Sequence, residues 1–121
     1  MVTRILILSS HKEWYDQLLK EDGTHPDDRE RMALFFVISG NRDLYQKRSF
    51  IYDFKKHHIL DCLSNREVDF SSGSKALIRL GFNLYNGYSD EESSPFSLMC
   101  HLDGENRKLA LDAISIRFAI H

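Results

Sequence analysis

Cysteine, proline and glycine are scarce in this sequence, with two, two and six residues respectively among 121. Two cysteines, Cys62 and Cys100, are too few for the disulfide framework of a small secreted protein, so we expect two reduced, buried thiols. The few prolines and glycines leave no flexible linker, and no tract of low complexity is present. We therefore expect a single globular domain over residues 1–121.

A long apolar run and an excess of one charge are also missing. The apolar run near the N-terminus, residues 5–8, has four residues, whereas a signal peptide needs about 7–15 and a membrane-spanning helix about 20. The formal net charge of −2 gives no overall attraction to nucleic acid or to anionic lipid. These absences predict a cytoplasmic protein that does not enter a membrane.

The sequence is instead rich in the signals that begin and end helices. Ser10 and Glu13, three residues apart, form a capping-box pattern, and Gly23 ends the helix that follows. A second helix is predicted to begin at Pro26, which suits a first helical position because it lacks an N–H, and to end at Gly40. Apolar residues at helical spacing support both helices.

Three further helices are predicted from the residues that cap them. Asn41 can cap a short helix, Ser71 or Ser72 a long one, and Asp103 the last one. Residues 96–102 are predicted to form another short helix.

The helix predicted over residues 72–86 is expected at the centre of the fold. Its polar side chains form one narrow stripe, and nearly all the positions between them are apolar. The stripe consists of Lys75, Arg79, Asn83 and Asn86. A helix that meets water along so thin a stripe is surrounded by its neighbours, and Gly81 on its buried side would let another helix approach closely.

The fold class predicted from these elements is all-α, an irregular bundle of five to six helices around the helix of residues 72–86. Competing signals occur in residues 50–54, where Phe50, Tyr52 and Phe54 alternate with other residues. This alternation favours a short extended segment, and a helix there stays open as the alternative.

Side chains that could bind a metal or attack a substrate are scattered along the chain. The candidates are His57, His58, Cys62, Cys100 and His101, whose spacing matches no zinc-binding pattern. The sequence also contains no motif of a serine hydrolase, a zinc protease or a dithiol oxidoreductase. We predict no metal, no cofactor and no catalytic residue. A small metal-dependent or thiol enzyme stays open as a further alternative, and it requires these side chains to converge in the fold.

A local concentration of positive charge occurs in residues 42–58, where five basic residues stand against two acidic ones and aromatic residues lie between them. This composition is typical of a surface that binds nucleic acid, and also of an amphipathic segment whose aromatic side chains pack inward. We expect binding contacts here and at the polar end of the 72–86 helix. The predicted contact residues are Arg42, Tyr45, Lys47, Arg48, Tyr52, Lys55, Lys56, Asn83, Asn86 and Tyr88.

Four stretches of the sequence resemble a known family. They are FVISGNRDLY (residues 36–45), IYDF (51–54), DFSSGSKALI (69–78) and FNLYNGY (82–88). The chain is similar, from about His11 to Phe118, to small uncharacterised proteins of low-GC Gram-positive bacteria, their phages and integrative elements, defined only as a domain of unknown function. The resemblance implies no activity, cofactor or catalytic residue. It implies a context in which small accessory proteins often bind, and often inhibit, a host or rival protein.

These observations together predict a non-enzymatic, protein-binding accessory protein of a mobile element or phage. An inhibitor of a host or defence protein and a homo-oligomer are two forms that this function could take. A nucleic-acid-binding regulator that uses residues 42–58 is the alternative.

Overall fold

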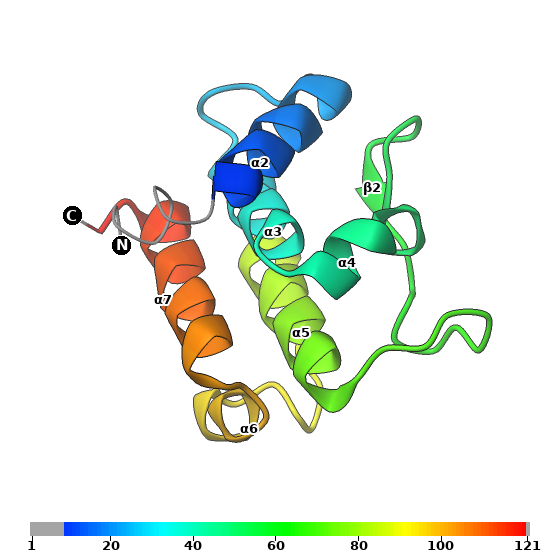
Figure 1. Cartoon of the computed structure of the whole chain (residues 1–121), viewed down its shortest axis with the longest axis vertical. Coiled ribbons are helices and arrows are strands. Elements are labelled where there is room, and N and C mark those ends of the chain that lie inside the picture. Colours follow the sequence, from blue (N-terminus) through cyan, green and yellow to red (C-terminus); the bar gives the residue numbers. More distant parts are fainter. Residues whose placement is uncertain (1–8, 121) are drawn as a thin grey trace.

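The computed structural model describes residues 9–120 (Figure 1). Within these residues it contains six α-helices, one short 3-10 helix and one two-stranded sheet. The helices are α2 (Ser9–Asp22), α3 (Arg29–Ser39), α4 (Arg42–Gln46), η1 (Arg48–Phe50), α5 (Ser72–Asn86), α6 (Pro95–Cys100) and α7 (Gly104–Phe118), and the strands are β1 (Tyr52–Asp53) and β2 (His58–Ile59). The fold is therefore an irregular, mostly all-α bundle, as predicted. No helix of residues 9–120 has the length and apolar character needed to cross a membrane.

The helix α3 lies in the middle of the bundle, with α2, α5 and α7 packed around it (Figure 1). Its second half is buried on every side, from Ala33 to Ser39. Burial of each large apolar side chain contributes about 1.5–3 kcal/mol, so this segment contributes strongly to the stability of the core.

The helix predicted over residues 72–86 is α5, and it packs against α3, α6 and α7. Its polar stripe is confirmed, because Asn83 and Asn86 are exposed while Ala76, Leu77 and Ile78 are buried. A Cβ atom on Gly81 would lie 3.0 Å from a methyl group of Leu34, so the glycine allows α3 to approach closely. The more enclosed helix is nevertheless α3, so the two helices share the centre of the fold.

Most helix ends follow the predicted caps. The side chains of Asn41, Ser71 and Asp103 accept hydrogen bonds from the backbone N–H three residues on, at the starts of α4, α5 and α7. Gly23 ends α2 with a φ of 72°, a conformation that glycine adopts without strain.

Two predicted helix starts are wrong. The helix α2 begins at Ser9, so Ser10 lies inside it and does not cap it. The second helix begins at Arg29 and not at Pro26, because the carboxylate of Asp28 accepts the N–H of Arg31 and caps the helix there. Pro26 lies in the turn that precedes this cap.

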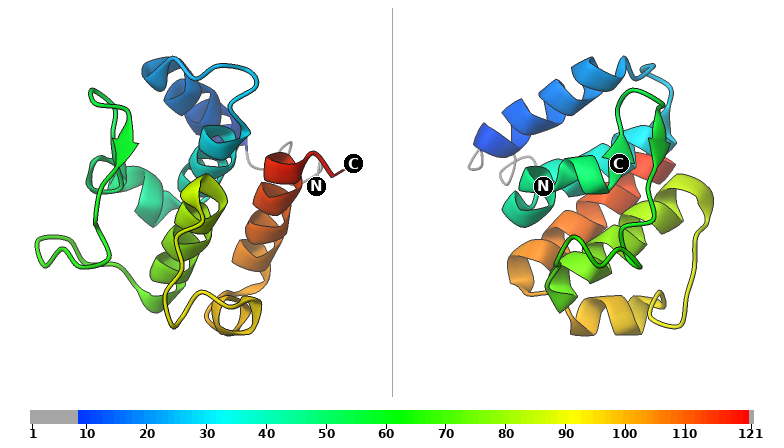
Figure 2. Two further views of the ribbon diagram at one scale, coloured as in Figure 1. Left: turned by 180° about the vertical axis from the view of Figure 1, so that it is seen from behind. Right: turned by 90° about the vertical axis from the view of Figure 1, so that its right-hand side faces the viewer.

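Residues 50–54 contain the end of η1 and the strand β1, so the predicted extended segment is confirmed for Tyr52 and Asp53. Strand β1 pairs antiparallel with β2, which makes a short hairpin over residues 52–59. At its tip, the carboxylate of Asp53 accepts the backbone N–H groups of Lys55 and Lys56 at 2.9 and 3.0 Å. Seen from the side in Figure 2, the hairpin lies on the same side of the molecule as α2 and α4.

Candidate functional site

Three side chains, Trp14, Tyr45 and Arg48, form a stack, and the contact between Trp14 and Tyr45 joins α2 to α4. The rings of Trp14 and Tyr45 are nearly parallel, at 5°, with centroids 4.4 Å apart. The guanidinium carbon of Arg48 lies 4.3 Å from the centroid of the Tyr45 ring, and its Nη1 donates to the Tyr45 carbonyl at 2.8 Å. Such ring–ring and cation–π contacts contribute about 0.5–1.5 kcal/mol each. All three side chains are partly exposed, so the stack is held in place and still reaches the surface.

The local sequence explains why Tyr45 faces α2. Asn41 caps α4 by accepting the N–H of Leu44 at 3.1 Å, which sets where the helix begins. Leu44 is then fully buried in the core, and Tyr45, the next residue, is turned about 100° around the helix axis. This rotation places Tyr45 at the edge of the core, where it meets Trp14.

The five basic side chains of residues 42–58 fall into two groups. Lys47 forms an ion pair with Asp43 at 2.8 Å and donates to the carbonyl of Asp69, while Arg48 belongs to the stack. Within residues 9–120, the other three form no ion pair and no side-chain hydrogen bond, and all are exposed. These three free cations are Arg42, Lys55 and Lys56.

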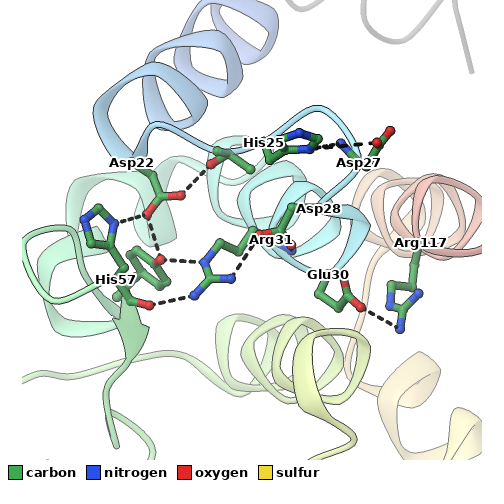
Figure 3. Close-up of polar contacts among 10 residues, drawn as sticks. Asp22, His25, Asp27, Asp28, Glu30, Arg31, His57 and Arg117 are labelled. Atoms are coloured by element: carbon green, nitrogen blue, oxygen red, sulfur yellow. Dashed lines mark hydrogen bonds and ion pairs between the residues drawn. The ribbon is translucent and has the colours of Figure 1, made fainter.

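A polar network centred on Asp22 fastens the hairpin to the helices (Figure 3). The buried carboxylate of Asp22 accepts hydrogen bonds from the hydroxyl of Thr24 at 2.6 Å and the hydroxyl of Tyr52 at 2.7 Å. It also lies 2.8 Å from Nδ1 of His57, and since a carboxylate only accepts, the ring proton is on Nδ1. Burial opposes ionisation of Asp22, but the three hydrogen bonds outweigh it and hold its pKa below the ordinary value.

Arg31 completes this network from α3. Its guanidinium donates to the Tyr52 hydroxyl at 2.9 Å, to the Asp28 carboxylate at 3.0 Å and to the carbonyl of His57 at 2.7 Å (Figure 3). Burial raises the pKa of the Tyr52 hydroxyl, which therefore stays protonated and can donate to Asp22. The network joins the end of α2, the start of α3 and the hairpin into one unit.

Tyr52 must be removed from the predicted contact residues. Its side chain is fully buried, and its hydroxyl group is used to hold the hairpin. The alternation around Tyr52 in the sequence shows that it lies in an extended segment, but not which face of that segment meets the core.

The three predicted contact residues at the end of α5 come together in a different place. The side-chain amide of Asn83 donates to the carbonyl of Tyr88 at 2.8 Å, and Asn86 accepts the Tyr88 N–H at 2.9 Å. The Tyr88 hydroxyl donates to Asp90 at 2.7 Å, and Arg79 donates to the same carboxylate at 2.9 Å. These polar groups shape the loop after α5, so their main contacts are internal.

The candidate metal ligands and nucleophiles are placed as follows. Among residues 9–120, no group of three or more His, Cys, Asp or Glu side chains could hold a metal ion. Cys62 is buried, and burial raises the pKa of its thiol to about 12, so it stays protonated and is a poor nucleophile. The prediction that both thiols are buried is wrong for Cys100, which is exposed at the end of α6.

The predicted contact residues omit Trp14, which the structure places in the stack. Trp14 lies four residues before Leu18, which is fully buried, so helical spacing alone would place it in the core. The signal that could have placed Trp14 at the edge of the core is the polar residue Gln17, which lies about one helical turn further along the chain.

The comparison with known protein families gives a match over the whole length of this sequence. Residues 1–121 match a family described as a family of unknown function (DUF6075). The chain belongs to this family. No curated protein and no solved structure matches the sequence. The family match confirms the predicted resemblance to an uncharacterised domain family. The description of this family names no activity.

Proposed function

We propose that this protein acts without catalysis, by binding another protein through the side formed by α2, α4 and the hairpin. We call the six residues concerned the basic aromatic surface; they are Trp14, Arg42, Tyr45, Arg48, Lys55 and Lys56. The observation that carries the proposal is the stack of Trp14, Tyr45 and Arg48. Tryptophan, tyrosine and arginine are the residues that contribute most often to binding energy at protein interfaces.

The rigidity of the stack supports this proposal. Ordering one long side chain at an interface costs about 0.5–1.5 kcal/mol, and internal contacts already hold Tyr45 and Arg48 in place. The Asp22 network likewise holds the hairpin that carries Lys55 and Lys56. A partner would therefore meet a surface whose geometry exists before binding.

The alternative, a nucleic-acid-binding regulator, has less support. Within residues 9–120, three of the five basic side chains in residues 42–58 form no ion pair and no side-chain hydrogen bond, whereas Lys47 and Arg48 make internal contacts. The net charge of −2 adds no long-range attraction for phosphates. A cation count this low favours a protein partner.

The biological setting is also part of the proposal. The resemblance to small proteins of phages and integrative elements supports a host or defence protein as the partner, inhibition of that protein as the result, and the cytoplasm as the place. A second copy of the chain is the other partner to consider.

The experiment is affinity capture from a bacterial lysate, followed by mass spectrometry, with two charge-matched variants. The test variant is Arg42→Glu/Lys55→Glu, and the control is Lys75→Glu/Lys108→Glu, whose side chains lie on α5 and α7. Arg48 is left intact because its removal would disturb the stack.

We expect wild type and control to capture the same protein, and the test variant to lose it. Capture of that protein by the test variant, or no specific capture by wild type, would contradict the proposal. Capture that disappears after nuclease treatment would support the nucleic-acid alternative instead.

A further inference from the structure

We infer that the partner offers an acidic segment with an apolar anchor, bound in an extended form across the basic aromatic surface. This inference rests on the proposed function and adds the chemistry of the partner. It follows from which charges on this side of the molecule are already compensated and which are not.

Within the described part of the chain, only Asp43 of the two acidic residues in 42–58 is paired with a cation at ion-pair distance. Asp43 pairs with Lys47 at 2.8 Å and accepts the hydroxyl of Ser74 at 2.9 Å. Asp53 accepts two backbone N–H groups at the hairpin tip, and these hydrogen bonds hold its pKa below the ordinary value, so it stays ionised and offsets part of the charge of Lys56. The basic residues Arg42, Lys55 and Lys56 form no ion pair and no side-chain hydrogen bond within residues 9–120, and their three charges exceed the one of Asp53, so this side keeps a net positive charge.

The free cations flank the stack. Arg42 and Tyr45 are three residues apart on α4, which makes them neighbours on the helix surface. At the other end, the contact between Asp22 and His57 fixes the hairpin tip against the end of α2, the helix that carries Trp14. Trp14 and Asp22 are eight residues apart, or about 12 Å along the helix at 1.5 Å per residue.

These separations fit a short extended peptide. Six to eight extended residues cover roughly 20–26 Å, which exceeds the rise of about 12 Å along α2 from Trp14 to Asp22. An aromatic or aliphatic side chain of the peptide can pack against the partly exposed side chains of Trp14 and Tyr45, while its carboxylates meet the cations.

A peptide fits better than a nucleic acid because α2 also contributes negative charge. Glu21 is exposed and lies two helical turns after Trp14, on the same face of α2. A phosphate backbone carries negative charge at every nucleotide and would be repelled there. A peptide carries separate carboxylates and can place a neutral residue opposite Glu21.

Peptide binding can be followed by the fluorescence emission of Trp14, because it is the one tryptophan of the chain and lies in the stack. The probe is a synthetic eight-residue peptide of glutamate and aspartate around a central phenylalanine. Its control has the same length and phenylalanine, with glutamine and asparagine in place of the acids. An oligothymidylate with the same number of negative charges is the third probe.

We expect the acidic peptide to change the emission of Trp14 and to bind at least tenfold more tightly than the amide peptide. The variant Arg42→Gln/Lys55→Gln/Lys56→Gln should lose at least tenfold in affinity, and Lys75→Gln/Lys108→Gln less than twofold. Circular dichroism and urea unfolding of both variants check that the fold is intact.

Two results would overturn the inference in different ways. Equal affinity for the acidic and amide peptides would refute an acidic partner, while the proposed function would stand if lysate capture still depends on Arg42 and Lys55. Tighter binding of the oligothymidylate than of the acidic peptide at the same salt concentration would refute the inference and the proposed function together.

Discussion

Replacing Tyr52 by phenylalanine removes a single oxygen atom from the contact between the hairpin and the helices. In the wild-type structure this hydroxyl group donates to the carboxylate of Asp22 at 2.7 Å and accepts from the guanidinium of Arg31 at 2.9 Å. The ring itself packs edge-on against Phe35, with centroids 4.9 Å apart, and phenylalanine preserves that contact. The substitution therefore tests the polar network and not the core packing.

The expected loss of stability follows from the charges of the two partners. A hydrogen bond to a charged group contributes about 1.5–3 kcal/mol. Tyr52 makes two of them, but Asp22 keeps Thr24 and His57, and Arg31 keeps two acceptors. We therefore expect Tyr52→Phe to lower the free energy of unfolding by about 1.5–3 kcal/mol, the value of roughly one such bond.

Urea unfolding followed by circular dichroism measures this loss. The matched control is Tyr45→Phe, since the Tyr45 hydroxyl makes no hydrogen bond within residues 9–120 and its ring remains stacked on Trp14. We expect the control to change the free energy of unfolding by less than about 0.5 kcal/mol. If both variants lose equally little, the network does not hold the hairpin and our account of that side of the molecule is wrong.

Three further predictions concern titration, packing and thiol reactivity. Because the pKa of Asp22 is lowered on folding, its stabilising effect is complete above the unfolded pKa of about 3.9 and is lost as the pH falls through the folded value. Urea unfolding between pH 6 and pH 2 should show a shallower decline for Asp22→Asn than for wild type. Gly81→Ala places a methyl group against α3, so we expect urea unfolding to show a free energy of unfolding lower by about 0.5–2 kcal/mol. Gly104→Ala adds its methyl group in open space, so we expect no change in the free energy of unfolding. At pH 8 a disulfide reagent should modify one thiol per native chain, Cys100, because burial raises the pKa of Cys62 to about 12.

Each of these predictions has an outcome that would count against it. Parallel pH dependence of Asp22→Asn and wild type would show that Asp22 titrates normally in the folded protein. A stabilised Gly81→Ala variant would mean that α3 yields easily to the added methyl group. Rapid modification of a thiol in Cys100→Ser would show that Cys62 is accessible.

The sequence was sufficient for the helices and for most of their ends. The side chains of Asn41, Ser71 and Asp103 bond to a backbone N–H only three residues away, so the information for each cap is local. The polar stripe along residues 72–86 likewise needs only the helical period to be interpreted. Local signals failed at the start of α3, where Pro26 and Asp28 competed and the cap at Asp28 determined the start.

The proposed binding surface depends on contacts between residues far apart in the chain. Trp14 and Tyr45 come from different helices, and Asp22 meets His57 across 35 positions of sequence. For this reason two tyrosines of the same segment differ in burial. Tyr45 lies at the edge of the core, whereas Tyr52 is fully buried. Periodicity shows that a face is apolar, but side-chain contacts between α2, α4 and the hairpin determine which part of that face stays exposed to water.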